Sequence, residues 1–206
     1  MQHRFIVLVS IVFLFSTLLI AKGGGKWEEV SKDDRLSLYK RKVPGSDIYE
    51  IKAVAYMSGT LKEAVNIIFD RNSHAGFFKY LEVSRQLRKT DSCDWAYCIV
   101  SAPLSSDRDY LVKSCHEKVG DNVSKIVWES FTDKNYPEND KHVRVKINNG
   151  YWQFTQVKPD EMKIDYYIHT DPGGSLPTFI KNLANKKAVP DTIWALSDEI
   201  LKRRKK

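Results

Sequence analysis

The side chains of this chain best suited to acid–base chemistry are the two carboxylates of Asp107-Arg108-Asp109. Two carboxyl groups this close together could act as a catalytic pair. The segment lies in a predicted loop beside Pro103, so we expect instead a turn held by local ion pairs. The other histidines after His3 lie at positions 74, 116, 142 and 169, and their scattered spacing fits no metal site. We therefore expect no metal and no cofactor.

Three cysteines follow the N-terminal region, at positions 93, 98 and 115. Their spacing fits no zinc site. If 94–102 and 110–118 are neighbouring strands, Cys98 and Cys115 could lie close enough for a disulfide. The alternative is that all three thiols are buried as small apolar side chains.

The first 25 residues differ from the rest of the chain. A basic start at His3-Arg4 precedes the apolar run Phe5–Ala21, and Gly23-Gly24-Gly25 follows. This order is typical of a signal peptide and predicts export to a periplasmic or extracellular location. The run is long for a signal and Leu19 is bulky for a cleavage site, so a membrane anchor formed by residues 5–21 is the alternative. We divide the chain into residues 1–25 and a domain over 26–206.

The remaining residues predict mainly strands, with apolar and polar residues alternating. We expect strands at 26–31, 36–43, 49–57, 83–89, 94–102, 110–118, 124–132, 143–147, 151–157 and 162–170. Leu61–Phe69 has helical spacing, and Thr60 with Glu63 forms a capping box. A second short helix is expected over 73–80, and Asn148-Asn149-Gly150 predicts a hairpin turn. The short links indicate an antiparallel meander.

The C-terminal segment 176–205 predicts a long amphipathic helix. Its position after the 162–170 strand suggests a helix laid across a sheet as the lid of a cavity. Pro190 predicts a bend or break between Asn185 and Pro190. We expect the turn at 171–174 to be the hinge of this lid.

Two segments together carry a resemblance to one family. The first is Ala102-Pro-Leu-Ser-Ser-Asp-Arg-Asp-Tyr-Leu-Val112. The second comprises Val143-Arg144-Val145, the 151–170 hairpin, Gly174-Ser-Leu-Pro-Thr-Phe-Ile-Lys-Asn-Leu183 and Val189-Pro190. In this order and spacing they resemble the StAR-related lipid-transfer (START) domains, and the likeness covers about residues 26–202. It implies an α+β helix-grip fold, in which a curved antiparallel sheet wraps a long C-terminal helix and encloses an apolar tunnel for one lipid-like ligand, for transport or sensing.

The resemblance brings no catalytic residues with it. Sterol-transporting members often carry a buried Glu/Arg pair on neighbouring strands, and Trp95 and Ser114 occupy those positions here. Losing both charges together is physically consistent, because one unpaired buried charge would be costly. A sterol of the usual kind is therefore not the expected ligand.

Aromatic residues on one parity of the strands, together with the helix, predict the cavity wall. The predicted wall residues are Trp95, Tyr97, Tyr110, Ser114, Trp152, Phe154, Ile164, Tyr166, Ile168, Phe179, Ile180, Leu183, Ile193 and Leu196. Each could instead be plain core. The competing function is a cyclase-like or hydrolase-like helix-grip enzyme, which would need ionisable groups inside the pocket.

The formal net charge of +7 allows an anionic partner, or serves solubility alone. The basic tail Lys202, Arg203, Arg204, Lys205 and Lys206 could contact anionic membrane. The same cations also favour the C-terminal end of a helix dipole without any partner. No aromatic side chains interleave with this tail, so nucleic acid is not expected. We expect a monomer.

Overall fold

The computed structural model describes residues 25–101, 105–174 and 178–206, without the side chains of 178–185. The strands are β1 (Glu28–Lys32), β2 (Leu36–Lys42), β3 (Tyr49–Ser58), β4 (Leu81–Lys89), β5 (Cys93–Val100), β6 (Arg108–Gly120), β7 (Val123–Ser130), β8 (Val143–Arg144), β9 (Ile147–Lys158) and β10 (Glu161–Asp171). The helices are α1 (Leu61–Ile68), the 3₁₀ helix η1 (Arg71–Gly76) and α2 (Thr178–Arg204). The predicted strands and the two main helices are all present.

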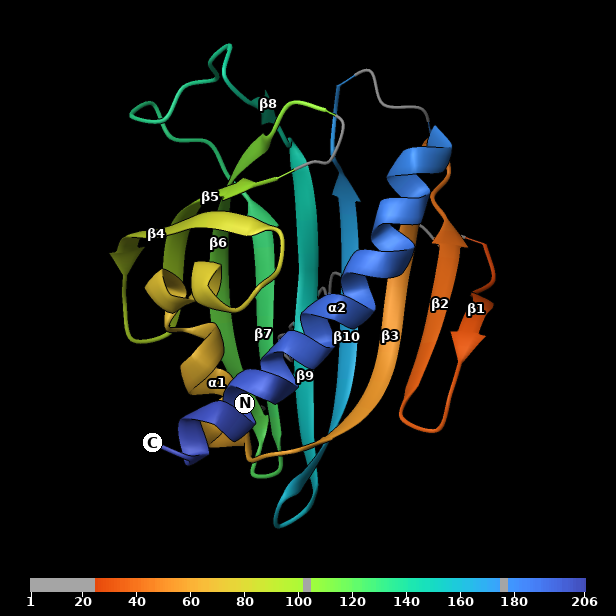
Figure 1. Cartoon of the computed structure of the whole chain (residues 1–206), viewed down its shortest axis with the longest axis vertical. Helices are drawn as coiled ribbons and strands as arrows, with labels where there is room; N and C mark the ends of the chain where they lie inside the picture. Colours follow the sequence, from red (N-terminus) through yellow and green to blue (C-terminus); the bar gives the residue numbers. More distant parts are fainter. Residues whose placement is uncertain (1–24, 102–104, 175–177) are drawn as a thin grey trace, which may run out of the picture.

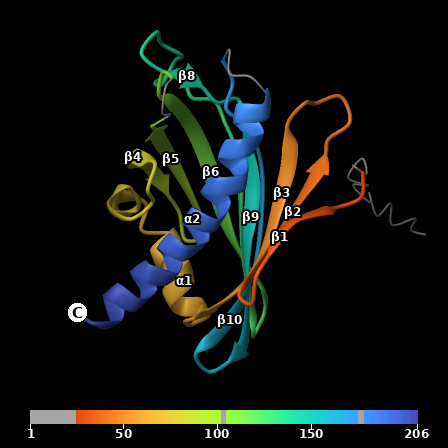
Figure 2. The same ribbon diagram turned by 45° about the vertical axis from the view of Figure 1, so that its right-hand side comes forward.

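A single curved sheet forms most of the molecule, and α2 crosses its concave face diagonally (Figure 1). The order is β1-β2-β3-β10-β9-β7-β6-β5-β4, with β8 attached to β6. Figure 2 shows the sheet curving around α2 from β1 on one side to β4 on the other. The predicted helix-grip fold is confirmed. The order is not a simple meander, because β10 pairs with β3, and β8 runs parallel to β6.

The apolar core lies between the sheet and α2. Alternation along the strands places one face of each strand inward. Residues 189, 193, 196 and 200 of α2 form a buried stripe against this face. Ala53 and Ala55 on β3 are fully buried, so the strand offers little side-chain bulk where α2 approaches. The core around α2 comprises Leu36, Leu38, Ile51, Ala53, Ala55, Met57, Ala64, Ile67, Ile68, Ile126, Trp152, Phe154, Met162, Ile164, Tyr166, Val189, Ile193, Leu196 and Ile200.

The start of α1 follows the prediction. The Thr60 hydroxyl accepts from the Glu63 amide, and the Glu63 carboxylate accepts from the Thr60 amide. This reciprocal cap satisfies amides that have no partner within the helix. The second predicted helix, 73–80, is instead the 3₁₀ helix η1, which begins earlier and is shorter.

Gly150 corrects another prediction, because residues 148–150 lie within β9 and form no turn. A Cβ at Gly150 would collide with the Tyr167 carbonyl oxygen and the Trp128 ring. A glycine is therefore needed at position 150 because the Trp128 ring packs against this strand. The sequence Asn148-Asn149-Gly150 alone cannot distinguish such a glycine within a strand from a glycine in a turn.

The helix α2 is continuous from Thr178 to Arg204 and contains Pro190. The prediction was a bend or a break between Asn185 and Pro190, and the break is wrong because the helix continues through Pro190. Proline removes one backbone hydrogen bond, but the buried stripe at Val189 and Ile193 keeps this part of the helix packed against the sheet. Within the described part of the chain, no helix is both long and apolar enough to span a membrane.

Candidate functional site

A cavity of about 230 Å³ lies between the middle of α2 and the β5–β7 part of the sheet. Its walls come from η1 and the segment after it, from β5, β6, β7, β9 and β10, and from residues 188–192 of α2. Apolar wall residues include Ile68, Phe78, Leu81, Val100, Val112 and Ile126. Such a mostly apolar, partly enclosed space suits a hydrophobic ligand.

Aromatic rings close the cavity toward β9 and β10. The Trp152 and Tyr166 rings meet edge to face with centroids 4.4 Å apart, and Trp128 lies 5.6 Å from Tyr166. Behind them, Phe154 stacks on Trp152 at 5.7 Å. Aromatic contacts of this kind stabilise a rigid wall.

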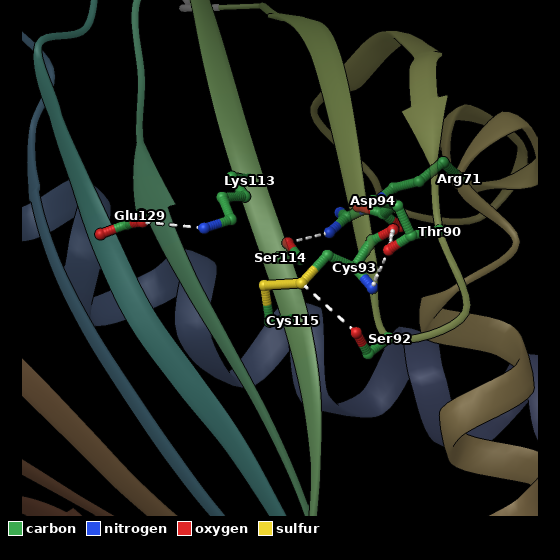
Figure 3. The surroundings of a disulfide bond; sticks show 9 residues. All are labelled: Arg71, Thr90, Ser92, Cys93, Asp94, Lys113, Ser114, Cys115 and Glu129. Carbon is green, nitrogen blue, oxygen red and sulfur yellow. Dashed lines mark hydrogen bonds and ion pairs between the residues drawn. A yellow bond between two sulfur atoms is a disulfide. The ribbon is translucent and has the colours of Figure 1, made fainter.

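One corner of the cavity is charged. Asp94 on β5 is completely buried, and its two oxygens each lie 3.0 Å from Nε of Arg71. Arg71 Nη2 also donates to Ser114 Oγ on β6 (Figure 3). Asp94 and Ser114 are cross-strand partners, so the strand register brings them together. The hydrogens of Nη1 have no partner among the described residues and can still be donated.

The titratable groups of the wall are held in neutral or paired states. Burial raises the pKa of Asp94, and the Arg71 charge opposes this. Burial lowers the pKa of His74 to about 3, so the imidazole is neutral at pH 7. Burial raises the pKa values of Tyr110 and Tyr166, which therefore stay protonated. The pKa values of His74, Tyr110 and Tyr166 are thus moved away from neutrality, whereas a general base needs a pKa near the working pH. The pKa of Asp94 is moved toward neutrality, but this carboxylate is paired with Arg71 and lies outside the cavity lining.

The cavity reaches the surface between α2 and the segment after η1. Asp191 of α2 accepts a hydrogen bond from the Tyr80 hydroxyl at 3.4 Å and pairs with Lys79 at 3.6 Å. Lys79 and Asp191 are partly exposed and all three residues line the cavity. These contacts join the two sides of the rim.

Several predicted wall residues do line the cavity, and others lie elsewhere. Those in the lining are Tyr110, Ser114, Trp152, Tyr166 and Ile168. Phe154, Ile164, Ile193 and Leu196 face the same side but are packed into the core, outside the lining. The side chains of Phe179, Ile180 and Leu183 lie outside the described residues.

Trp95 and Tyr97 are placed on the opposite face of β5, contrary to the prediction. The Arg88 guanidinium lies over the Trp95 ring, and its Cζ atom is 3.6 Å from the ring centroid. The Tyr97 hydroxyl donates to Asp109, and its ring stacks on Tyr136. Cys98, not Tyr97, pairs with Tyr110 across the strands. Side chains alternate between the two faces of a strand, so assigning the inward face one residue out of register exchanged the two faces of β5 in the prediction.

The same shift affects the predicted loss of a buried charge. The position next to Trp95, Asp94, carries a buried carboxylate, and its cation comes from Arg71 in η1 rather than from a neighbouring strand. The prediction that no charged pair remains was therefore wrong. Arg71 lies outside every predicted strand, so strand alternation could not place it beside Asp94. The signal that could have found it is a basic residue just after the predicted 61–69 helix.

The segment Asp107-Arg108-Asp109 was predicted to be a turn held by local ion pairs, and its role in the structure differs in detail. Asp109, the second residue of β6, makes a bidentate ion pair with Arg144, in which both N–O distances are 2.8 Å. The pair is long-range rather than local. Burial would raise the pKa of Asp109, but the Arg144 hydrogen bonds outweigh it and the pKa is lowered. The pair fixes β8 to the sheet.

The cysteines pair differently from the predicted alternatives. Cys93 and Cys115 form a disulfide between β5 and β6, beside the charged corner (Figure 3). Cys98 is a buried free thiol in the cavity lining. Both the proposed Cys98–Cys115 bond and the alternative of three free thiols are therefore wrong. The cross-strand register, which places Cys93 opposite Cys115, decides the pairing.

Comparison with known proteins identifies the family. The START domain family model matches residues 16–194. The chain belongs to the START domain family. This START domain is 23% identical over 205 residues to an uncharacterized protein of Pseudomonas aeruginosa, covering 97% of this chain and 98% of the relative. It is also 23% identical over 179 residues to the bovine phosphatidylcholine transfer protein, covering 83% and 82% of the two chains.

Solved structures share the fold of this START domain. A STAR-related lipid transfer protein fragment from Xanthomonas axonopodis aligns with a TM-score of 0.77 and 25% identity, covering 84% of this chain and 98% of the fragment. Human STARD10 aligns with a TM-score of 0.79 at 18% identity, covering 87% and 74%. The Zhui aromatase/cyclase from Streptomyces shares the fold at a TM-score of 0.57 and 10% identity, covering 75% and 94%. The fold thus occurs in lipid transfer proteins and in an enzyme.

Proposed function

We propose that this START domain binds one amphiphilic lipid in the cavity between α2 and the sheet and carries it between membranes. The observation that carries the proposal is an apolar cavity with a single charged corner, where Arg71 Nη1 has hydrogens left to donate. The apolar part of the ligand would lie against Val112, Ile126 and Ile168. Each CH₂ group moved there from water contributes about 0.8 kcal/mol.

Arg71 is the candidate partner for the polar group of the ligand. A phosphate or carboxylate oxygen can accept from Nη1 while Asp94 keeps the guanidinium in place. The protonated hydroxyl of Tyr166 offers a further donor in the same cavity. The relatives named as lipid transfer proteins, among them one for phosphatidylcholine, support a ligand of this general kind.

A binding function is better supported than the enzyme alternative. An enzyme acting by acid–base chemistry needs a group whose pKa suits proton transfer near neutral pH. The described wall holds a neutral His74 and protonated tyrosines, and the Asp94 carboxylate behind it is already paired with Arg71. Groups in these states can orient a ligand by hydrogen bonding, but they do not provide a general base.

Blocking the cavity tests the proposal. Val112→Trp places a large ring in the lining. Lys113→Trp adds the same ring on the opposite face of the same strand and serves as the matched control. We expect Val112→Trp to weaken binding of a fluorescent lipid analogue at least about tenfold, or 1.4 kcal/mol, and the control to bind normally. Native mass spectrometry of the purified wild-type protein should show one co-purifying lipid per chain.

Transfer is measured separately, as the rate at which the protein moves labelled lipid from donor to acceptor vesicles. Acceleration that is lost in Val112→Trp supports a carrier, whereas binding without acceleration supports a lipid sensor. Normal lipid binding in a folded Val112→Trp variant would contradict the proposed site.

We also propose that α2 acts as a lid. Asp191 links the lid to the segment after η1, so ligand access requires the Tyr80 and Lys79 contacts to break. Bound lipid should slow hydrogen exchange of residues 178–189 more than that of the 151–170 hairpin. Equal exchange with and without lipid would leave α2 as a static core helix.

A further inference from the structure

The cavity occupies only part of the space between α2 and the sheet. Toward β2 and β3, the concave face is filled by core side chains. Phe154 and Ile164 are fully buried there, as are Ile193 and Leu196 of α2, and none of them lines the cavity. Among the described side chains, the space left for a ligand therefore lies on the side of η1, β5, β6 and β7.

The boundary between these two parts is the group of rings at Trp152, Tyr166 and Trp128, which we name the aromatic partition. Each of these rings lines the cavity, and Trp152 has Phe154 stacked directly behind it. Trp152 and Tyr166 are cross-strand partners on β9 and β10, so the sheet itself holds them side by side. The Trp128 ring is seated over Gly150, where a larger residue would displace it. The partition is thus supported by backbone as well as by ring contacts.

The size of the confined space restricts what it can enclose. Its volume of about 230 Å³ exceeds the roughly 150 Å³ that holds one benzene molecule. It falls short of the roughly 300–1,000 Å³ of pockets that enclose drug-sized ligands. Only the part of a lipid that enters the cavity has to fit this volume, and the polar group can stay at the rim. One acyl chain needs less enclosed volume than the two chains of a phospholipid, so the confined space favours one chain over two.

We infer that this START domain takes a lipid with a single acyl chain, such as a fatty acid or a lysophospholipid, and that the aromatic partition excludes the second chain. The inference rests on the proposed function and narrows its ligand class. One chain can follow the apolar wall from the rim at Asp191 toward Val112 and Ile126, with its polar group left near Arg71 or at the rim.

Competition with the wild-type protein tests the number of chains. The probe is a fatty acid carrying an anthroyloxy fluorophore, and the competitors are palmitate, 1-palmitoyl-lysophosphatidylcholine and vesicles of dipalmitoyl phosphatidylcholine. Native mass spectrometry after each incubation identifies the bound lipid directly. We expect a 1:1 complex with palmitate or with the lysophospholipid, and the two arms distinguish a carboxylate from a phosphate headgroup. We expect no complex with the two-chain lipid.

Opening the partition tests the mechanism. Trp152→Ala should enlarge the cavity by the volume of the indole ring and raise binding of dipalmitoyl phosphatidylcholine at least tenfold. Trp95→Ala removes the same side chain from the outer face of β5 and should leave the ligand preference unchanged. Trp152→Leu is the milder variant if the alanine variant does not fold.

A wild-type 1:1 complex with the two-chain lipid would overturn the inference and leave the proposed function intact. Failure of both lipid classes to bind the folded protein would overturn the proposed function, and this inference with it. An unchanged preference for single-chain lipid in folded Trp152→Ala and Trp152→Leu proteins would show that the partition does not set the limit.

Discussion

At the scale of single residues, the placement of Asp94 determines the electrostatics of the cavity. The carboxylate lies behind Arg71 and outside the cavity lining, while Arg71 and Ser114 face the cavity. The pair is therefore nearly neutral as a whole, yet it presents a donor to the ligand. Ionic groups in such a place rarely add net stability, because desolvation opposes their attraction. A role in orienting a ligand gives a reason for their presence.

Removing only one member of this pair should be far more damaging than removing both. Asp94→Leu leaves the Arg71 charge buried without its partner and should lower the free energy of unfolding by about 3–5 kcal/mol. The double variant Arg71→Met/Asp94→Leu should recover most of that loss, while binding lipid more weakly than wild type. Urea unfolding measures all three proteins. Equal stability of the single and double variants would show that the two side chains are not energetically coupled.

At the scale of elements, the C-terminal end of α2 is clamped to the rest of the domain. Arg203 pairs with Asp70 before η1 at 2.9 Å, and Arg204 pairs with Glu63 on α1 and with Asp160 in the β9–β10 turn. Lys202 pairs with Glu199 at 3.2 Å, so three of the five basic tail residues predicted to contact membrane are engaged within the domain. We propose that any contact with anionic membrane is made by Lys205 and Lys206, and that the clamp holds this end of α2 while the other end moves.

The clamp predicts a pH dependence of stability. The hydrogen bonds from Arg204 hold the pKa of Glu63 at about 2, below its usual value of 4.5. A carboxylate with a lowered pKa stabilises the folded state above pH 4.5, and that stability is lost as the pH falls toward 2. Glu63→Gln should lower stability at pH 7 by about 0.5–1 kcal/mol, because the pair is partly exposed. The difference from wild type should shrink between pH 4.5 and 2.

Thermal unfolding followed by circular dichroism at several pH values measures this difference. Glu129→Gln is the control, since its pair with Lys113 is longer, at 3.7 Å, and largely exposed. A Glu63→Gln deficit that stays constant down to pH 2 would argue against the ion pair as its source.

The β5–β6 disulfide makes a second prediction at this scale. Cys93 and Cys115 are 22 residues apart in sequence, so the bond restricts the unfolded chain. Reduction, or the Cys93→Ser/Cys115→Ser variant, should lower the free energy of unfolding by about 2–4 kcal/mol. Cys98→Ser serves as the control for changing a buried thiol. Identical unfolding curves of oxidised and reduced protein would contradict this role.

At the scale of the whole molecule, the disulfide and the N-terminal apolar run point to the same compartment. Disulfides persist in oxidising environments such as the periplasm or the cell exterior. The run Phe5–Ala21 lies outside the described residues, and its composition suits a signal or an anchor. We propose that the domain works outside the cytosol.

Protein isolated from its native host checks this proposal. Its first residue should lie between Lys22 and Trp27, or the full-length chain should fractionate with membrane. Thiol labelling should find one free cysteine, Cys98, in the folded protein after denaturation. A full-length, freely soluble cytosolic protein with three reduced thiols would refute export.

The sequence by itself determined the elements and the type of fold. Alternation along the strands, the Thr60–Glu63 capping box and the apolar spacing of Ile193, Leu196 and Ile200 are local patterns, so they can be read without knowing the neighbours. The shared face of Trp152 and Tyr166 also followed, because a short hairpin joins their strands and fixes their register. The resemblance to START domains then supplied the arrangement of helix and sheet.

Only the tertiary structure decided the register of β5, and with it the composition of the cavity. Alternation shows that Trp95 and Asp94 face opposite sides, but it does not say which side is inward. The large residues Trp95 and Tyr97 lie on the outer face, and the buried face carries Asp94, Ala96 and Cys98, so side-chain size pointed to the wrong face. Pairing with β6 settles this, because it sets Asp94 opposite Ser114 and Cys93 opposite Cys115. The arrival of Arg71 from η1 and the division of the interior by the aromatic partition depend in turn on contacts between distant segments. Those contacts leave no periodic signal in the chain.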